Sequence, residues 1–139
     1  MQQFWPKNKR GALSITFDDA RPTQATHGIP ILDEYGIKST FYVIAKSVEL
    51  NRDTWKAAVA NGHEIGNHTV THPCSGNFSF SRHKALEEYS LEQMEKEFAD
   101  ANDAIKVLLC VPPQAFAYPC GQTFVGRGED PKSYVPLVA

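Results

Sequence analysis

Short apolar segments with strand character alternate with segments of helical character along most of the chain. The predicted strands are residues 12–17, 38–44, 64–67 and 115–118. Parallel strands need crossover connections, and helices usually supply them, so this alternation indicates parallel pairing. The sequence therefore predicts an α/β fold on a parallel sheet of about four strands.

Helical periodicity is clearest in the second half of the chain. Ser90-x-x-Gln93 is a capping-box signature, and apolar residues follow at helical spacing up to Leu108, before Pro112. A shorter helix is predicted over residues 23–35, bent or shortened by Pro30. Another is expected from Asp53 or Thr54 to Val59, because Asn61 and Gly62 follow as stop signals.

Composition narrows the class of protein. The 139 residues are 42% hydrophobic and 22% charged, which is typical of one globular domain or part of one, here residues 1–139. A net charge of -2 gives no indication of a nucleic-acid partner, and no apolar run reaches the roughly 18 residues of a membrane span. Residues 1–11 have no apolar core and are no signal peptide, so we expect a cytoplasmic protein or an exported one already trimmed.

The cysteines give little guidance. Cys74, Cys110 and Cys120 are an odd number at wide spacings. A disulfide framework is therefore not predicted, although one pair could form. The favoured interpretation is three free thiols, buried or half-buried.

A polar cluster follows three of the predicted strands. Asp18-Asp19 follows the first, residues 68–72 follow the third, and Pro119-Cys120-Gly121 follows the fourth. The carboxyl ends of parallel strands share one face of the sheet, where sites are commonly built. The three clusters therefore predict a site on that face.

The first two clusters have the composition of a metal site. Adjacent carboxylates such as Asp18 and Asp19 repel each other in a dry pocket, unless a cation or a division of roles relieves them. His68 and His72, four residues apart, can hold a metal from one side of a turn. Two histidines and one aspartate leave open positions, as a catalytic zinc, cobalt or nickel requires. The plainer alternatives are a helix cap for the aspartates and two unrelated surface histidines.

The remaining histidines are less suggestive. His63 lies at the opposite end of its short strand, where a structural role is favoured. His27 and His83 have no partner in the sequence and are expected at the surface. Cys74 is disfavoured as a soft ligand because Pro73 restricts its approach.

Several segments resemble a known family. Leu13-Ser-Ile-Thr-Phe-Asp-Asp19 resembles the first motif of the NodB-homology domain, the catalytic domain of the polysaccharide deacetylases of carbohydrate esterase family 4. Residues 62–72 (GHEIGNHTVTH) resemble its second motif, and residues 116–121 (FAYPCG) resemble a variant of its third. Residues 33–43 fit the junction between a helix and a strand of that family.

The resemblance implies a fold, an activity and a set of roles. The fold would be part of a distorted (β/α) barrel. The activity would be metal-dependent hydrolysis of N-acetyl or O-acetyl groups on a carbohydrate, with zinc the first choice of metal and cobalt or nickel the others. Asp18 would be the general base and the backbone N–H of Cys120 part of an oxyanion hole. The metal ligands would be Asp19, His68 and His72, and the substrate contacts Tyr118 and Pro119.

The sequence also departs from the family pattern. Ala20 replaces a usual Gly, Ala117 replaces an Arg that would orient the base, and Cys120 replaces an aromatic residue. Two further motifs, one of which supplies the general acid as Leu-x-His, do not occur in these 139 residues. We therefore expect a domain incomplete at its C-terminal end, weak or inactive alone, that self-associates through the open side of its barrel.

Two alternatives to the deacetylase interpretation stay open. One is a catalytically idle fragment that binds a metal or a carbohydrate. The other is a xylan-type O-acetyl esterase on the same scaffold. The motifs act on the acetyl group and not on the sugar, so the sequence does not separate N-acetyl from O-acetyl substrates.

Overall fold

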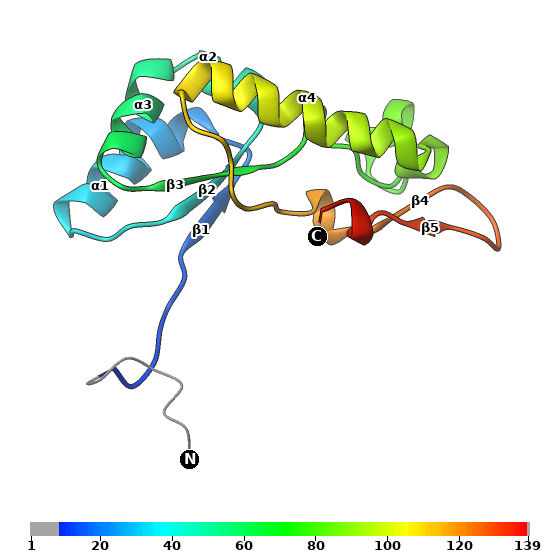
Figure 1. The fold of residues 1–139 in the computed structure, drawn as a ribbon, viewed down its shortest axis with the longest axis horizontal. Coiled ribbons are helices and arrows are strands. Elements are labelled where there is room, and N and C mark those ends of the chain that lie inside the picture. Colours follow the sequence, from blue (N-terminus) through cyan, green and yellow to red (C-terminus); the bar gives the residue numbers. More distant parts are fainter. Residues whose placement is uncertain (1–8, 139) are drawn as a thin grey trace.

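A parallel sheet of three strands forms the centre of the computed structural model, which describes residues 9–138 (Figure 1). The strands are β1 (Thr16–Asp18), β2 (Thr40–Val43) and β3 (Glu64–Asn67), in the spatial order β1-β2-β3. Sequence order and spatial order coincide, so each connection crosses over by a helical segment. The predicted α/β class is confirmed.

Apolar packing around β2 builds the main core. Phe41 is fully buried, stacks on Phe17 of β1 at 5.1 Å between ring centroids, and meets Trp55 edge-on at 5.2 Å. Val43 and Ile65 continue the buried surface along the sheet. This core fixes the strand register, and with it the position of the polar residues at the strand ends.

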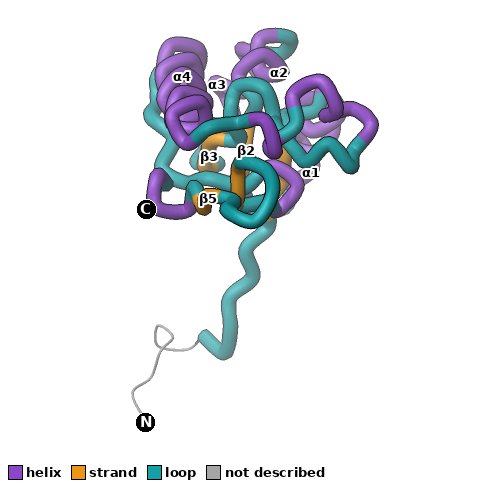
Figure 2. Tube along the Cα trace, turned by 90° about the vertical axis from the view of Figure 1, so that its right-hand side faces the viewer, coloured by secondary structure: helices purple, strands orange, loops and turns teal. Residues whose placement is uncertain are grey.

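Three helices connect or follow the strands. The helix predicted over residues 23–35 is present in two parts, a π-helical turn at Gln24–Gly28 and then α1 (Ile29–Glu34), with Pro30 in its first turn. The short predicted helix is α3 (Arg52–Ala60). A further short helix, α2 (Ala45–Glu49), was not predicted. Figure 2 shows these helices around the strands, viewed along the long axis of the molecule.

The longest helix, α4 (Leu91–Leu109), crosses the molecule above the sheet (Figure 1). Its predicted capping box is present, with Ser90 and Gln93 each bonded to the backbone of the other. It ends at Cys110, which adopts a left-handed conformation with φ 62°. One stripe of its surface is buried: Met94, Phe98, Ala101, Ile105 and Leu109. Within the described residues, no helix reaches the length and apolar character that a membrane span requires.

The predicted fourth strand is reduced to a single parallel bridge between Asn67 and Phe116. The Asn67 N–H donates to the Ala115 carbonyl at 2.7 Å, and the Ala117 N–H donates to the Asn67 carbonyl at 3.1 Å. Pairing goes no further because Pro119 has no N–H and begins a 3₁₀ turn. About four strands was therefore too many: three form the sheet within residues 9–138.

The predicted first strand is shorter than expected. Residues 12–17 were predicted, whereas β1 covers Thr16–Asp18 and includes the first aspartate. Its register pairs Thr16 with Thr40, the first residue of β2, and the Ile15 carbonyl accepts a hydrogen bond from the Thr40 N–H at 3.1 Å, so pairing with β2 ends at Ile15. Leu13 is accordingly 84% exposed.

A second, smaller apolar cluster lies beneath the N-terminal half of α4, which contributes Met94 and Phe98 to it. Its hairpin, β4 (Phe124–Val125) and β5 (Lys132–Ser133), is antiparallel and was not predicted. The apolar side chains of this cluster include Leu86, Val125 and Tyr134. The other short helical turns are 3₁₀ segments at Ser79–Lys84, Leu86–Glu88 and Val135–Leu137.

Candidate metal centre

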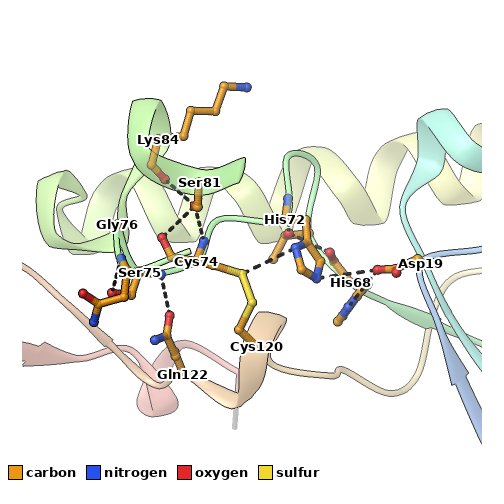
Figure 3. Close-up of a disulfide and its surroundings, with 12 residues drawn as sticks. Asp19, His68, His72, Cys74, Ser75, Gly76, Ser81, Lys84, Cys120 and Gln122 are labelled. Atoms are coloured by element: carbon orange, nitrogen blue, oxygen red, sulfur yellow. Dashed lines mark hydrogen bonds and ion pairs between the residues drawn. A yellow bond between two sulfur atoms is a disulfide. The ribbon is translucent and has the colours of Figure 1, made fainter. Parts of the chain in front are cut away.

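Three side chains from two strand ends converge on one point (Figure 3). Asp19 follows β1, while His68 follows β3 and His72 lies four residues further along the same loop. Asp19 Oδ1 lies 3.7 Å from His68 Nε2 and 3.6 Å from His72 Nε2. The three candidate ligand atoms all lie within 4.8 Å of one another.

These separations suit metal ligands. They are too long for good hydrogen bonds, yet ligands bonded to zinc at about 2.0–2.2 Å in a tetrahedron lie about 3.3–3.6 Å apart. Two imidazoles and one carboxylate are also a donor set that zinc, cobalt and nickel accept. The residues that the sequence singled out therefore fit a divalent metal.

The backbone around the centre is unusual. Asp19, Thr69 and His72 have φ values of 77°, 64° and 53°, in the left-handed region that residues other than glycine rarely adopt. Each such residue costs on the order of 1–3 kcal/mol and persists where its surroundings over-determine it. Here Thr69 N–H donates to the Asn67 side chain at 2.7 Å, and His72 N–H donates to the Thr69 hydroxyl at 3.0 Å.

The imidazole of His68 is almost fully buried, with 1% of the residue exposed. Its Nδ1–H donates to the carbonyl oxygen of Ala117 at 2.9 Å. The proton on Nδ1 leaves the lone pair of Nε2 directed toward Asp19, which is how a second contact orients a metal-binding histidine. Although Ala117 lacks the side chain of the family's arginine, its backbone orients this ligand.

His72 is half-buried and lies edge-on to His68, with 4.7 Å between ring centroids. Burial lowers the pKa of His72, and the neighbouring His68 lowers it further, while Asp19 acts in the opposite direction. A lower pKa favours the neutral imidazole, which is the form that binds a metal. Its Nδ1 lies 3.5 Å from the sulfur of Cys74.

Asp19 offers its two oxygens to different partners. Oδ1 faces the two histidines, while Oδ2 accepts a hydrogen bond from Nε of Arg21 at 3.2 Å. Asp18, the predicted base, lies in β1 with an exposed side chain, and its carbonyl accepts a bond from Gln24 at 2.6 Å. The arginine of this segment therefore pairs with the candidate ligand and not with the candidate base.

Glu97 on α4 is a residue of the site that the sequence did not reveal. Its carboxylate accepts bonds from the backbone N–H groups of Val70 and Thr71, both at 2.9 Å, and from the Thr71 hydroxyl at 2.8 Å. These residues lie between His68 and His72, so α4 holds the loop that carries both imidazoles. The sequence feature that could have indicated Glu97 is its place beside the apolar stripe of α4, three residues after Met94.

The expectation of three free thiols is wrong. Cys74 and Cys120 form a disulfide with 6.0 Å between their Cα atoms, while Cys110 is free and exposed. The bridge at Phe116 brings the segment that carries Cys120 beside the loop that carries Cys74, a proximity that a separation of 46 residues does not predict. Since both sulfurs are bonded to each other, Cys74 is no metal ligand here.

The predicted substrate contacts lie in packed surroundings. Tyr118 meets Phe116 edge-on at 5.0 Å, and its ring centroid lies 5.6 Å from that of Tyr134, while Pro119 is buried. Tyr118 also lines a pocket of about 410 Å³ together with Asn67 of β3, but none of the three candidate ligands lines it. Contact of Tyr118 and Pro119 with substrate stays a prediction.

The other histidines lie outside the centre. His63 is buried, its Nδ1 accepts a bond from the Ser39 N–H at 3.2 Å, and its Nε2 lies 3.1 Å from Asp33 Oδ1. These contacts support the structural role favoured from the sequence. His27 and His83 are exposed, as expected.

Comparison with known proteins identifies the family. The sequence model of the family described as polysaccharide deacetylase matches residues 6–125. The chain belongs to the polysaccharide deacetylase family.

Three curated relatives show how varied the similar proteins are. A "Gellan lyase" of Bacillus sp is 30% identical over 118 residues, which are 85% of this chain and 4% of that protein. A "Peptidoglycan-N-acetylglucosamine deacetylase" of Bacillus cereus is 37% identical over 75 residues, 53% of this chain and 35% of the relative. A "Chitooligosaccharide deacetylase" of Sinorhizobium fredii is 30% identical over 105 residues, 73% and 44% of the two chains. The chain thus spans less than half the length of these relatives.

Solved structures extend the similarity to the fold. The Streptococcus pyogenes deacetylase PplD, in complex with acetate, superposes with a TM-score of 0.70 at 25% identity, over 94% of this chain and 53% of that one. A family 4 acetyl xylan esterase from Clostridium thermocellum, in complex with a cobalt ion, superposes with a TM-score of 0.62 at 28% identity, over 78% and 49%. The described residues correspond to part of the (β/α) barrel of these deacetylases.

Proposed function

We propose that this chain carries the metal centre of a carbohydrate deacetylase that hydrolyses N-acetyl groups of an amino sugar. The observation that carries the proposal is the convergence of Asp19 Oδ1, His68 Nε2 and His72 Nε2 at the carboxyl end of the parallel strands. Zinc is the metal that we propose, with cobalt or nickel as alternatives, because imidazole and carboxylate suit all three. The cobalt complex of the related esterase supports a divalent transition metal, with cobalt among the candidates.

The proposed chemistry divides the work among the residues of the centre. A bound divalent ion would polarise the acetyl carbonyl and lower the pKa of a water molecule. We assign the proton of the attacking water to the Asp18 carboxylate, which is exposed beside the candidate ligand Asp19. The backbone N–H of Cys120 would donate to the acetyl oxygen as negative charge develops on it.

The relatives support an amino-sugar substrate. Two of them are named for deacetylation of N-acetylglucosamine in peptidoglycan or of chitooligosaccharides. The related acetyl xylan esterase keeps an O-acetyl ester open as the second candidate. Release of acetate from N-acetylchitooligosaccharide and from acetylated xylan, compared at equal enzyme concentration, separates the two.

The disulfide supports an exported protein over a cytoplasmic one. Disulfides persist in oxidising compartments and are rare in the cytosol, where thiols are kept reduced. Cys74 and Cys120 are bonded in the structure. We therefore propose that the protein functions outside the cytoplasm and that residues 1–139 are part of one deacetylase domain.

Zinc binding tests the proposal directly. Apo protein titrated with zinc should bind one ion per chain, and His68→Ala should abolish tight binding. His83→Ala, which removes an exposed histidine outside the centre, is the matched control and should bind as the wild type does. Equal stoichiometry in wild type and His68→Ala would refute the metal centre. If the full-length protein that contains this chain bound zinc but released no acetate, the catalytically idle alternative would be favoured.

A further inference from the structure

The Cys74–Cys120 disulfide joins the two loops that carry the proposed chemistry. Cys74 lies two residues after His72, and Cys120 lies in the turn Pro119–Gly121 (Figure 3). The first loop holds two candidate metal ligands, and the second holds the backbone N–H proposed for the oxyanion. Neither this disulfide nor a role for it was predicted from the sequence.

One sulfur of the bond touches a metal ligand. Cys74 Sγ lies 3.5 Å from His72 Nδ1. A disulfide sulfur has no hydrogen to donate, so this contact is a hydrogen bond in the tautomer that carries the ring proton on Nδ1. His72 then has its lone pair on Nε2, the atom that lies 3.6 Å from Asp19 Oδ1. The disulfide thus does for His72 what the Ala117 carbonyl does for His68.

The bond also fixes two strained pieces of backbone. His72 and Cys120 both lie in the left-handed region, with φ values of 53° and 55°. Such conformations persist where neighbouring contacts over-determine them. Cys74 is fully buried, and the next residue, Ser75, donates its N–H to the Gln122 side chain at 2.6 Å, so a second link joins the same two loops.

We propose that the Cys74–Cys120 disulfide is a positioning element of the metal centre. It holds the His72 imidazole in the tautomer that presents Nε2 to the ion, and it fixes the Cys120 amide relative to that ion. The inference rests on the proposed metal function of His68 and His72. It makes the two cysteines part of the machinery for binding and orientation, although neither sulfur is a proposed ligand.

Zinc affinity of the cysteine variants is the first test. In Cys74→Ala/Cys120→Ala, both the covalent link and the acceptor for His72 Nδ1 are lost, and zinc should bind about 10- to 100-fold more weakly, as on loss of other contacts that orient a ligand. Cys120→Ala alone removes the link but keeps a sulfur beside His72, so it should lose less. Cys110→Ala, at the free exposed cysteine, is the control and should bind zinc as the wild type does.

The His68→Ala variant separates failure of this inference from failure of the proposed function. If His68→Ala loses zinc while the double cysteine variant binds as tightly as wild type, the positioning role is refuted and the metal centre stands. If His68→Ala keeps zinc, the proposed function itself is refuted. Circular dichroism of each apo variant shows whether it is folded.

A measurement on the wild-type protein covers the case in which the double variant does not fold. Nitrogen-15 NMR of the metal-free, oxidised protein reports which ring nitrogen of His72 carries the proton in the neutral form. We expect the proton on Nδ1, with Nε2 free. A proton on Nε2 would overturn the inference, because the disulfide would then not set the tautomer that a metal needs.

Discussion

Glu97 accepts two hydrogen bonds from Thr71, one from its backbone N–H at 2.9 Å and one from its hydroxyl at 2.8 Å. The carboxylate belongs to α4, and Thr71 precedes His72 in the ligand loop. Bonds of this kind to an ionised acceptor are shorter and stronger than neutral ones. The geometry of the candidate metal centre therefore depends on a helix that contributes no ligand to it.

Glu97→Gln should loosen the ligand loop. An amide in place of the carboxylate keeps one oxygen for the two backbone N–H groups but loses the charge that strengthens these bonds and the acceptor for the Thr71 hydroxyl, so about 1–3 kcal/mol of unfolding free energy should be lost. Zinc affinity should fall as well, because both imidazoles are then less well placed. Urea unfolding and zinc titration measure the two effects. Glu95→Gln, at an exposed position of the same helix, is the control, and an equal loss there would contradict the assignment.

The convergence of Asp19, His68 and His72 was largely predictable because these candidate ligands have a local pattern. His68 and His72 are four residues apart, and Asp19 ends an apolar strand, so spacing and strand order sufficed to bring them together. Glu97 and the Cys74–Cys120 bond were not predictable, since both depend on how α4 and the residues after Phe116 pack on the loop. Such contacts are set by tertiary packing and leave no spacing in the sequence.

The helices and strands show the same contrast between features set by one segment and features set by tertiary packing. Helix α4 was predicted because a capping box and an apolar stripe are properties of one segment. The fourth strand was overestimated because a strand needs a neighbour that runs beside it for several residues, and only Asn67 pairs with that segment. Pairing length is decided by two segments together, and residues 115–118 alone do not encode it.

Asp18→Asn should separate catalysis from metal binding. In the full-length protein, the turnover number for acetate release should fall by about 10²-fold or more, the usual size for loss of a general base. Zinc affinity should change little, whereas Asp19→Asn should weaken it strongly. Steady-state kinetics and zinc titration on both variants measure these effects. If Asp18→Asn lost the metal and Asp19→Asn kept it, the roles of the two carboxylates would be reversed.

Asp33 should make stability depend on acid pH. Hydrogen bonds from Lys38 first, then from Asn61, lower the pKa of this carboxyl from 3.8 to about 2. Because the pKa is lower in the folded state, the carboxylate stabilises the fold fully above about pH 4, and this contribution is lost as pH falls toward 2. Asp33→Asn should therefore unfold at a lower temperature than wild type at pH 6, and the difference should shrink by pH 2.

Thermal unfolding followed by circular dichroism across this pH range provides the measurement. Glu34→Gln, at the exposed neighbouring carboxyl, is the control and should keep the pH profile of the wild type. A gap between wild type and Asp33→Asn that stays constant from pH 6 to pH 2 would contradict the linkage.

The 139-residue chain should self-associate. Within the described residues β1 pairs with β2 alone, which leaves its other edge without a strand, and Leu13 beside it is 84% exposed. Unpaired edges and exposed apolar side chains favour association. Light scattering should show a dimer or larger species, reduced in Leu13→Lys but not in Leu50→Lys, at an exposed leucine that follows α2. A monodisperse monomer of the wild type at high concentration would refute the prediction.

The positions of the three ligands along the sheet give a bound ion a mechanical role. Asp19 directly follows β1, whereas both histidines follow β3, on the other side of β2. An ion held by all three would link the end of β1 to the loop after β3, in addition to the hydrogen bonds between β1 and β2. Amide hydrogens of β1 should then exchange with solvent more slowly when zinc is bound, so departure of the metal and peeling of the first strand would be one coupled event.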